Sequence, residues 1–205
     1  MMQKYLRFLW LSLLLASFQT HADSDGKQFT SHLGFKLGTV TLVDVQKKLG
    51  SAQLITAGEG GAHEISVCYV IQNGYVSFLS SGEMGGSNHQ LLGFGVSKFN
   101  KEDAKQCAQY PGKPKFDPAI LEIAGLHLGM SKEQFKKIVS TKVEWDGEVG
   151  SGIFASKKTM SAEELVKFTN GDKTAQNYFD VTISVTGNFN KNKLEAFEIW
   201  KVETY

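Results

Sequence analysis

An internal repeat constrains the fold of this chain more than any other sequence feature. Residues 33–38 read Leu-Gly-Phe-Lys-Leu-Gly, and residues 124–129 read Ala-Gly-Leu-His-Leu-Gly, with both glycines at a constant offset. Each segment leads into a candidate helix start. The pair Thr41 and Asp44 in the first segment, and the pair Ser131 and Gln134 in the second, each resemble a capping box. Such self-similarity indicates two copies of one structural unit.

Each copy is predicted to begin with a short helix. Val45 and Leu49, and likewise Phe135 and Val139, are four residues apart and therefore lie on one helix face. A glycine precedes each cap by two or three residues, and glycine favours the tight, left-handed turn that would lead into the helix. A third capping box at Ser161 predicts a further short helix in the second half.

Strands are predicted after each helix. In the first half, 65–71 and 75–80 flank an Asn-Gly hairpin signal, and a third strand covers 90–98. In the second half, one or two strands lie in 143–156 around a glycine turn at 147–152. Strands over 178–186 and 194–203, joined by a loop at 188–192, close the chain. The expected fold is α+β, with two tandem repeats, each a short helical element followed by an antiparallel β-meander packed on it.

The N-terminus has the features of a secretory signal peptide. Lys4 and Arg7 precede an apolar run over 8–18, and Thr20 and Ala22 place small residues at a cleavage site. The run is short for a membrane anchor, which is the alternative interpretation. The predicted organisation is a signal peptide (1–22), a first repeat (23–107), a Pro-containing linker (108–119) and a second repeat (120–205). The protein is expected in the periplasm or outside the cell, without a membrane anchor.

Charge and cysteine content agree with that location. Without Lys4 and Arg7, the 22 basic side chains fall to 20 against 21 acidic ones, so the mature chain is near neutral and lacks the excess of positive charge that nucleic-acid binding requires. Cys68 and Cys107 predict one disulfide in an oxidising compartment, with two buried thiols as the alternative.

No catalytic or metal-binding motif stands out, and no cofactor is expected. His63-Glu64 begins a run that lacks the second histidine of a zinc-binding helix. No Gly-x-Ser-x-Gly nucleophile motif occurs, and the paired cysteines are poor nucleophile candidates. The chain is therefore predicted not to be an enzyme, although a small hydrolase with an unrecognised site remains an alternative.

Two regions are candidates for binding a partner. Residues 80–87 are rich in glycine and serine and would present Glu83 and Met84, unless they form an ordinary flexible loop. In the last two strands, alternation directs some side chains away from the core, and an aromatic ring among acids and hydroxyls is typical of interfaces. The candidates here are Tyr178, Asp180, Glu198 and Trp200. The alternative for Trp200 is burial between the two repeats.

The repeated motif resembles that of the secreted β-lactamase inhibitor protein (BLIP) family and the related BamE (SmpA) lipoprotein module. In the second half the match is carried by Gly125, Leu128, Gly129, Met130, Ser131, Gln134 and Phe135. In the first half it is carried more loosely by Gly34, Leu37, Gly38, Thr41, Asp44, Val45, Leu49 and Gly50.

The resemblance implies a non-enzymatic, protein-binding module that uses its sheet surfaces. Its partner would be another protein, such as a secreted or periplasmic enzyme that it inhibits. The alternative is an envelope maintenance or assembly factor like BamE. The chain departs from both groups, because it lacks the lipoprotein cysteine and both of its cysteines are in the first half.

Overall fold

The computed structural model describes residues 25–59, 63–71, 73–111, 118–170, 172 and 174–205. The predicted signal peptide and its cleavage site lie outside the described residues, as does half of the predicted linker, 112–117. No helix in the described part of the chain is long and apolar enough to span a membrane.

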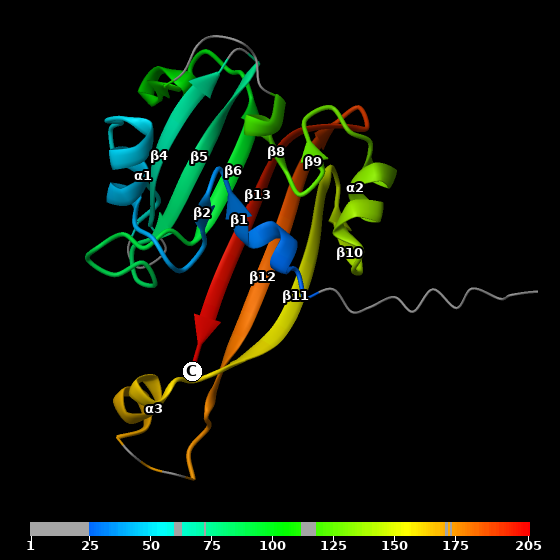
Figure 1. Ribbon diagram of the computed structural model, residues 1–205. Coiled ribbons are helices and arrows are strands. Elements are labelled where there is room, and N and C mark those ends of the chain that lie inside the picture. Colours follow the sequence, from blue (N-terminus) through cyan, green and yellow to red (C-terminus); the bar gives the residue numbers. More distant parts are fainter. Residues whose placement is uncertain (1–24, 60–62, 72, 112–117, 171, 173) are drawn as a thin grey trace, which may run out of the picture.

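One large, mainly antiparallel sheet runs through the molecule (Figure 1). The strands from the first half are β3 (Ile55–Ala57), β4 (Glu64–Ile71), β5 (Gly74–Ser81), β6 (Gly93–Lys98) and β7 (Ala108–Gln109). Those from the second half are β10 (Val143–Asp146), β11 (Val149–Thr159), β12 (Tyr178–Asn190) and β13 (Lys193–Thr204). The order is β10-β11-β12-β13-β6-β5-β4-β3, with β7 pairing parallel to β4. The halves therefore join where β6 pairs with β13.

Short helices and hairpins complete the fold. In the first half, the 3₁₀ helix η1 (Lys27–Thr30) and the hairpin of β1 (Ser31–His32) and β2 (Phe35–Lys36) precede α1 (Leu42–Leu49). In the second half, η4 (Pro118–Leu121) and the hairpin of β8 (Glu122–Ile123) and β9 (Leu126–His127) precede α2 (Lys132–Val139). The remaining elements are η3 (Asp103–Gln106) and α3 (Ala162–Thr169). The predicted α+β class is confirmed.

In the described part of the chain, α1, α2 and α3 each begin with the capping box that the sequence predicts. The side chains of Thr41, Ser131 and Ser161 each accept a hydrogen bond from the backbone three residues on, and the side chain at that position bonds back to the cap. This reciprocal bonding satisfies backbone donors that a helix N-terminus would otherwise leave unpaired. These short helices are thus positioned by local sequence.

The helices lie on one face of the sheet, which holds the hydrophobic core. The apolar faces of α1 and α2 are buried, as predicted. Phe135 of α2 contacts Phe189 of β12 with their rings 5.4 Å apart, and Phe168 of α3 contacts Phe179 at 5.1 Å. Inward-facing residues alternate along β12, where Phe179, Val181, Ile183 and Val185 are all buried.

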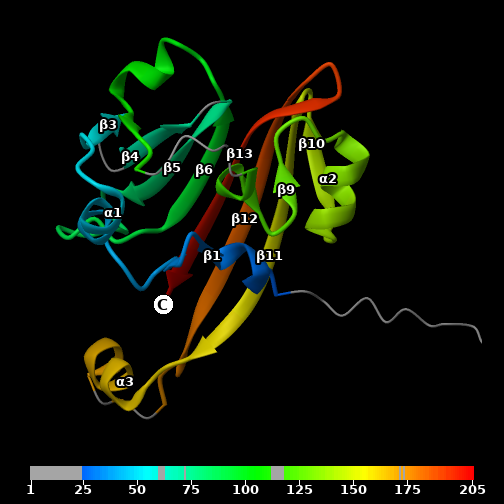
Figure 2. The ribbon, with the colours of Figure 1, turned by 45° about the horizontal axis from the view of Figure 1, so that its top comes forward.

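The two halves also meet across this covered face. The first hairpin crosses in front of β12 and β13 (Figure 2), and Phe29 of η1 lies 5.6 Å from Phe154 of β11. His32 of β1 bonds to the carbonyl oxygen of Ile120 in η4, with its Nε2 atom 2.9 Å away. Together, η1 and the first hairpin therefore pack on β11 and on η4 of the second half.

The predicted glycine turn at 147–152 is wrong in its extent. Only Gly147 lies in the turn, whereas Gly150, Ser151 and Gly152 belong to β11. A Cβ on Gly150 would lie 2.6 Å from the Trp145 ring, and one on Gly152 would lie 2.4 Å from Val139. These glycines therefore allow a tryptophan and α2 to approach the strand closely.

The predicted loop at 188–192 is also shorter than expected. β12 continues to Asn190 and β13 begins at Lys193, so that Lys191 and Asn192 alone make the turn. Both have positive φ, 49° and 60°, as in the two-residue type I′ turn that matches the twist of a hairpin.

Replacing Gly129 with valine is expected to lower the free energy of unfolding by about 1–2 kcal/mol, since a β-branched residue is strained at positive φ. Gly129 has φ 83°, and its N–H donates to the carbonyl oxygen of Leu194 over 2.7 Å. No atom lies within 4 Å of an added Cβ, so the cost comes from the backbone alone. Urea unfolding would measure it. Gly129→Asn, which tolerates this conformation better, is the control, and equal stability of the valine variant would contradict the turn.

Candidate functional site

The sheet face opposite α1, α2 and α3, called the open face below, carries a cavity of about 550 Å³. The cavity forms where the ends of β4 and β5 and the loop after β5 come close to β13. Both halves of the chain contribute to it. Its lining residues are His63, Glu64, Ser81, Glu83, Met84, Trp200 and Val202.

The loop that presents Glu83 and Met84 is a sequence of turns held by backbone hydrogen bonds. Gly82 donates to the carbonyl oxygen of His63 over 2.9 Å, and Gly85 donates to that of Ser81 over 2.8 Å. The ring of His63 covers Gly82 so closely that a Cβ there would lie 1.9 Å from it. Met84 remains 52% exposed. The loop therefore displays both predicted side chains from a hydrogen-bonded base.

Trp200 lies at the join between the two halves. It pairs with Gly93 of β6, and an added Cβ on Gly93 would lie 3.0 Å from the indole ring. Its Nε1–H donates to Oε2 of Glu198 over 3.1 Å, which fixes the ring orientation. The side chain is half-buried. Trp200 thus packs on the first half and also lines the cavity, and its role in binding a partner stays a prediction.

The charged groups at the cavity are mostly acidic. Burial raises the pKa of the Glu64 carboxyl above its usual value, and the negative charge of Glu198 raises it further. Glu83 is exposed on the loop. A carboxyl group with a raised pKa in a concave site is typical of functional surfaces.

Three of the predicted binding residues, Tyr178, Asp180 and Glu198, do not line this cavity, although Glu198 adjoins it through its bond to Trp200. Asp180 pairs with Thr204 and Trp200 pairs with Ser184, which places them roughly 13 Å apart along the strands. Lys157 of β11 lies over the Tyr178 ring, 3.8 Å from its centroid, and opposite Asp180 in the register. These two side chains therefore interact with a lysine of the same sheet.

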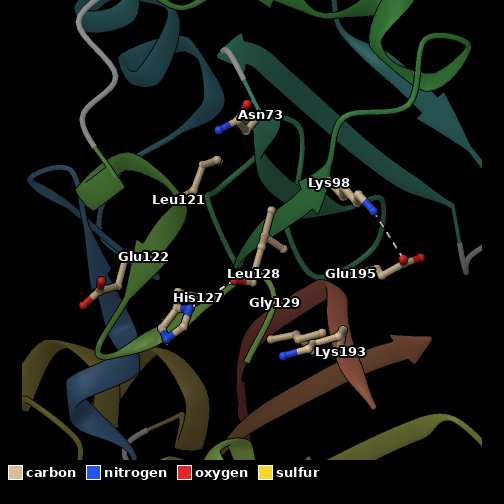
Figure 3. Close-up of a pocket in the computed structure, with 10 residues that line it drawn as sticks. Asn73, Lys98, Leu121, Glu122, His127, Leu128, Gly129, Lys193 and Glu195 are labelled. Carbon is tan, nitrogen blue, oxygen red and sulfur yellow. Dashed lines mark hydrogen bonds and ion pairs between the residues drawn. The ribbon is translucent and has the colours of Figure 1, made fainter. Parts of the chain in front are cut away.

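A second cavity, of about 620 Å³, lies beside the β8–β9 hairpin (Figure 3). Leu121 and Leu128 supply apolar surface, while Lys98 pairs with Glu195 at 3.5 Å on its rim. Both signs of charge are present there. The open-face cavity is the stronger candidate, because predicted binding residues from both halves converge on it.

No known protein family, curated protein or solved structure matches this chain. Its functional assignment therefore depends on the geometry of the site. Among the described residues, no group of three His, Cys, Asp or Glu side chains is arranged to hold a metal ion.

The predicted disulfide is present and borders the open face. Cys68 of β4 is bonded to Cys107, and their Cα atoms are 4.8 Å apart. Cys68 shares its side of β4 with Glu64 and Ser66, since side chains on a strand alternate.

Sequence reasoning missed Glu64, His63 and Val202 as parts of the cavity. The sequence around His63 and Glu64 suggests only an incomplete metal-binding motif. The usable signal was strand alternation, which places Glu64 on the same side of β4 as Cys68, and Val202 on the same side of β13 as Trp200. Alternation alone could not show that β4 and β13 contribute to one cavity.

Proposed function

We propose that the protein is a non-enzymatic binding module that holds another protein against the open face of its sheet. The observation that carries this proposal is the convergence of Trp200, Glu83 and Met84 on one cavity in a face that α1, α2 and α3 leave uncovered. Tryptophan and methionine are enriched at protein interfaces, and partly exposed aromatic rings are frequent hot spots.

The proposal includes an origin of the architecture from two tandem repeats. The order of the paired strands supports it, because β3 to β6 run inward to the join in the same succession as β10 to β13 do from the other side. Each half also has a short hairpin followed by an eight-residue capped helix. This arrangement agrees with the resemblance to the inhibitor family, whose tandem-repeat members use their sheet surfaces to bind a partner protein.

We further propose that the protein works in the periplasm or outside the cell. The disulfide supports this location, since such bonds persist in oxidising compartments. The partner would then be another secreted or periplasmic protein, and an enzyme under inhibition is the expected case.

Trp200→Ala is expected to weaken binding of the partner at least about 30-fold, which is typical of a central aromatic hot spot. Tagged protein (residues 23–205) would capture partners from periplasmic extract, and mass spectrometry would identify proteins retained by the wild type and lost by the variant. Calorimetry with the purified partner would then give the ratio of dissociation constants.

Two control variants make this test specific. Trp200→Phe keeps an aromatic ring over Gly93, so it should retain more binding than the alanine variant. Glu133→Ala changes an exposed side chain of α2, on the other side of the molecule from the open face, and should bind like the wild type. Capture that is equal for the wild type and Trp200→Ala would exclude the cavity as the binding site, and unfolding of Trp200→Ala would show that the side chain is a core residue.

A further inference from the structure

The open-face cavity has acidic groups but lacks a lysine or arginine in its lining. Glu64 and Glu83 line it, and Glu198 lies close enough to Glu64 to raise the pKa of its carboxyl. Lys201 lies next to Trp200 in sequence, but its ammonium group bonds to Glu203 at 2.5 Å, and alternation directs it to the covered face. The described cavity therefore has an excess of negative charge.

Acidic side chains elsewhere in the molecule are often paired. Lys158, for example, bonds to Glu164 at 3.1 Å and to Glu203 at 3.0 Å. Within the described part of the chain, no lysine pairs with Glu64, Glu83 or Glu198. A half-buried carboxylate without a counter-ion is unfavourable, and a cation from another molecule would remove that cost.

The remaining walls of the cavity also suit a cation. The face of an indole ring attracts positive charge, most strongly when both groups leave water. The Trp200 ring is held by its bond to Glu198 and by contact with Gly93. Met84 adds a polarisable, exposed side chain at the rim.

We infer that the open-face cavity receives an arginine side chain of the partner protein, with the guanidinium group against Trp200 and within reach of Glu64 and Glu83. Arginine fits better than lysine because its planar group stacks on aromatic rings and donates several hydrogen bonds in fixed directions. The only arginine of this chain is Arg7, within the predicted signal peptide. The arginine would therefore be supplied by the partner.

This inference rests on the proposed function, but a peptide can test it separately. The probe is the capped tripeptide acetyl-Gly-Arg-Gly-amide, and the matched control peptide contains citrulline, which has nearly the same shape but no charge. NMR titration of residues 23–205 would follow the indole N–H signal of Trp200. We expect weak, saturable binding of the arginine peptide and no shift with the citrulline peptide.

Variants of the protein provide the second comparison. Glu64→Gln and Glu83→Gln should each weaken peptide binding about fivefold, as expected for loss of one charged contact. Glu133→Gln, on the exposed side of α2, should leave binding unchanged. Glu64→Gln should also melt at the same temperature as the wild type or higher, because it removes an unpaired charge.

The outcomes distinguish this inference from the proposed function. An unmoved Trp200 signal, or equal shifts with both peptides, would overturn the arginine site. Capture of a partner that depends on Trp200 but is unaffected by Glu64→Gln and Glu83→Gln would also overturn it, while the binding function would stand. Charge-dependent peptide binding without any captured protein would support the cation preference and contradict the protein-binding function.

Discussion

Cys68→Ser is expected to lower the free energy of unfolding by about 3–4 kcal/mol under oxidising conditions, because the disulfide closes a loop whose entropy the unfolded chain would otherwise regain. The two cysteines are separated by 39 residues. Cys68 is also 4% exposed, so a serine hydroxyl there would be largely removed from water. Urea unfolding at neutral pH would measure the loss.

The redox state provides the control. With a reductant strong enough to reduce the disulfide, most of the difference in unfolding free energy between the wild type and Cys68→Ser should disappear. Cys107→Ser should resemble Cys68→Ser, since each removes the same covalent link. If the wild type and both variants unfold at one urea concentration without reductant, the disulfide does not stabilise the fold.

The local structure could be predicted from short-range chemistry. Thr41, Ser131 and Ser161 are caps because a hydroxyl and a side chain three residues later can bond to the same helix start. The Asn-Gly signal and the alternation along 178–186 likewise depend on neighbours in sequence. The hairpins β1–β2 and β8–β9 could not be predicted in this way, since strands of two residues have no period to detect.

Long-range pairing could not be predicted in this way. Alternation shows that Trp200 and Phe197 point to opposite faces of β13, but it does not show that β6 is the neighbouring strand. The pairing places the Trp200 ring against Gly93, where a larger residue would collide with it. Cross-strand aromatic–glycine pairs of this kind help to fix register in sheets.

Individual residues of the candidate site could be predicted, but their assembly into one cavity could not, because it depends on long-range strand pairing. Glu83, Met84 and Trp200 were each selected from local composition or alternation, and the fold brings these three together. The same alternation selects Tyr178 and Asp180, yet they lie near Lys157 at the start of β12, away from the cavity. The pattern identifies the face of the sheet, whereas the position along it depends on the strand register.

Stability is expected to fall in mild acid because of His32, which sequence analysis did not single out. Burial lowers the pKa of its imidazole from 6.5 to about 4, although the bond to the Ile120 carbonyl oxygen opposes this effect. The ring also contacts Phe94, 5.7 Å away. The side chain is 7% exposed, so the folded protein holds it neutral, with Nε2–H as the donor.

The direction of the pH effect follows from these pKa values. Because the unfolded chain binds the proton more readily, the stability that His32 contributes is present above pH 6.5 and is lost as the pH falls toward about 4. The full loss would be about 3–4 kcal/mol, at roughly 1.4 kcal/mol for each pKa unit. Urea unfolding at several pH values would measure this loss. Protonation of carboxylates also changes the stability over this pH range, in the wild type and in every variant.

His32→Gln separates this contribution from the carboxylates, because the glutamine amide can still donate to the Ile120 carbonyl oxygen but does not titrate in this range. The variant should therefore show a shallower fall in stability than the wild type between about pH 6.5 and pH 4. His127→Gln, at an exposed position, should keep the slope of the wild type. Parallel plots of unfolding free energy against pH for the wild type and His32→Gln would contradict this prediction. They would mean that His32 accepts a proton in the folded protein as readily as in the unfolded chain, so that burial does not disfavour the charged imidazole.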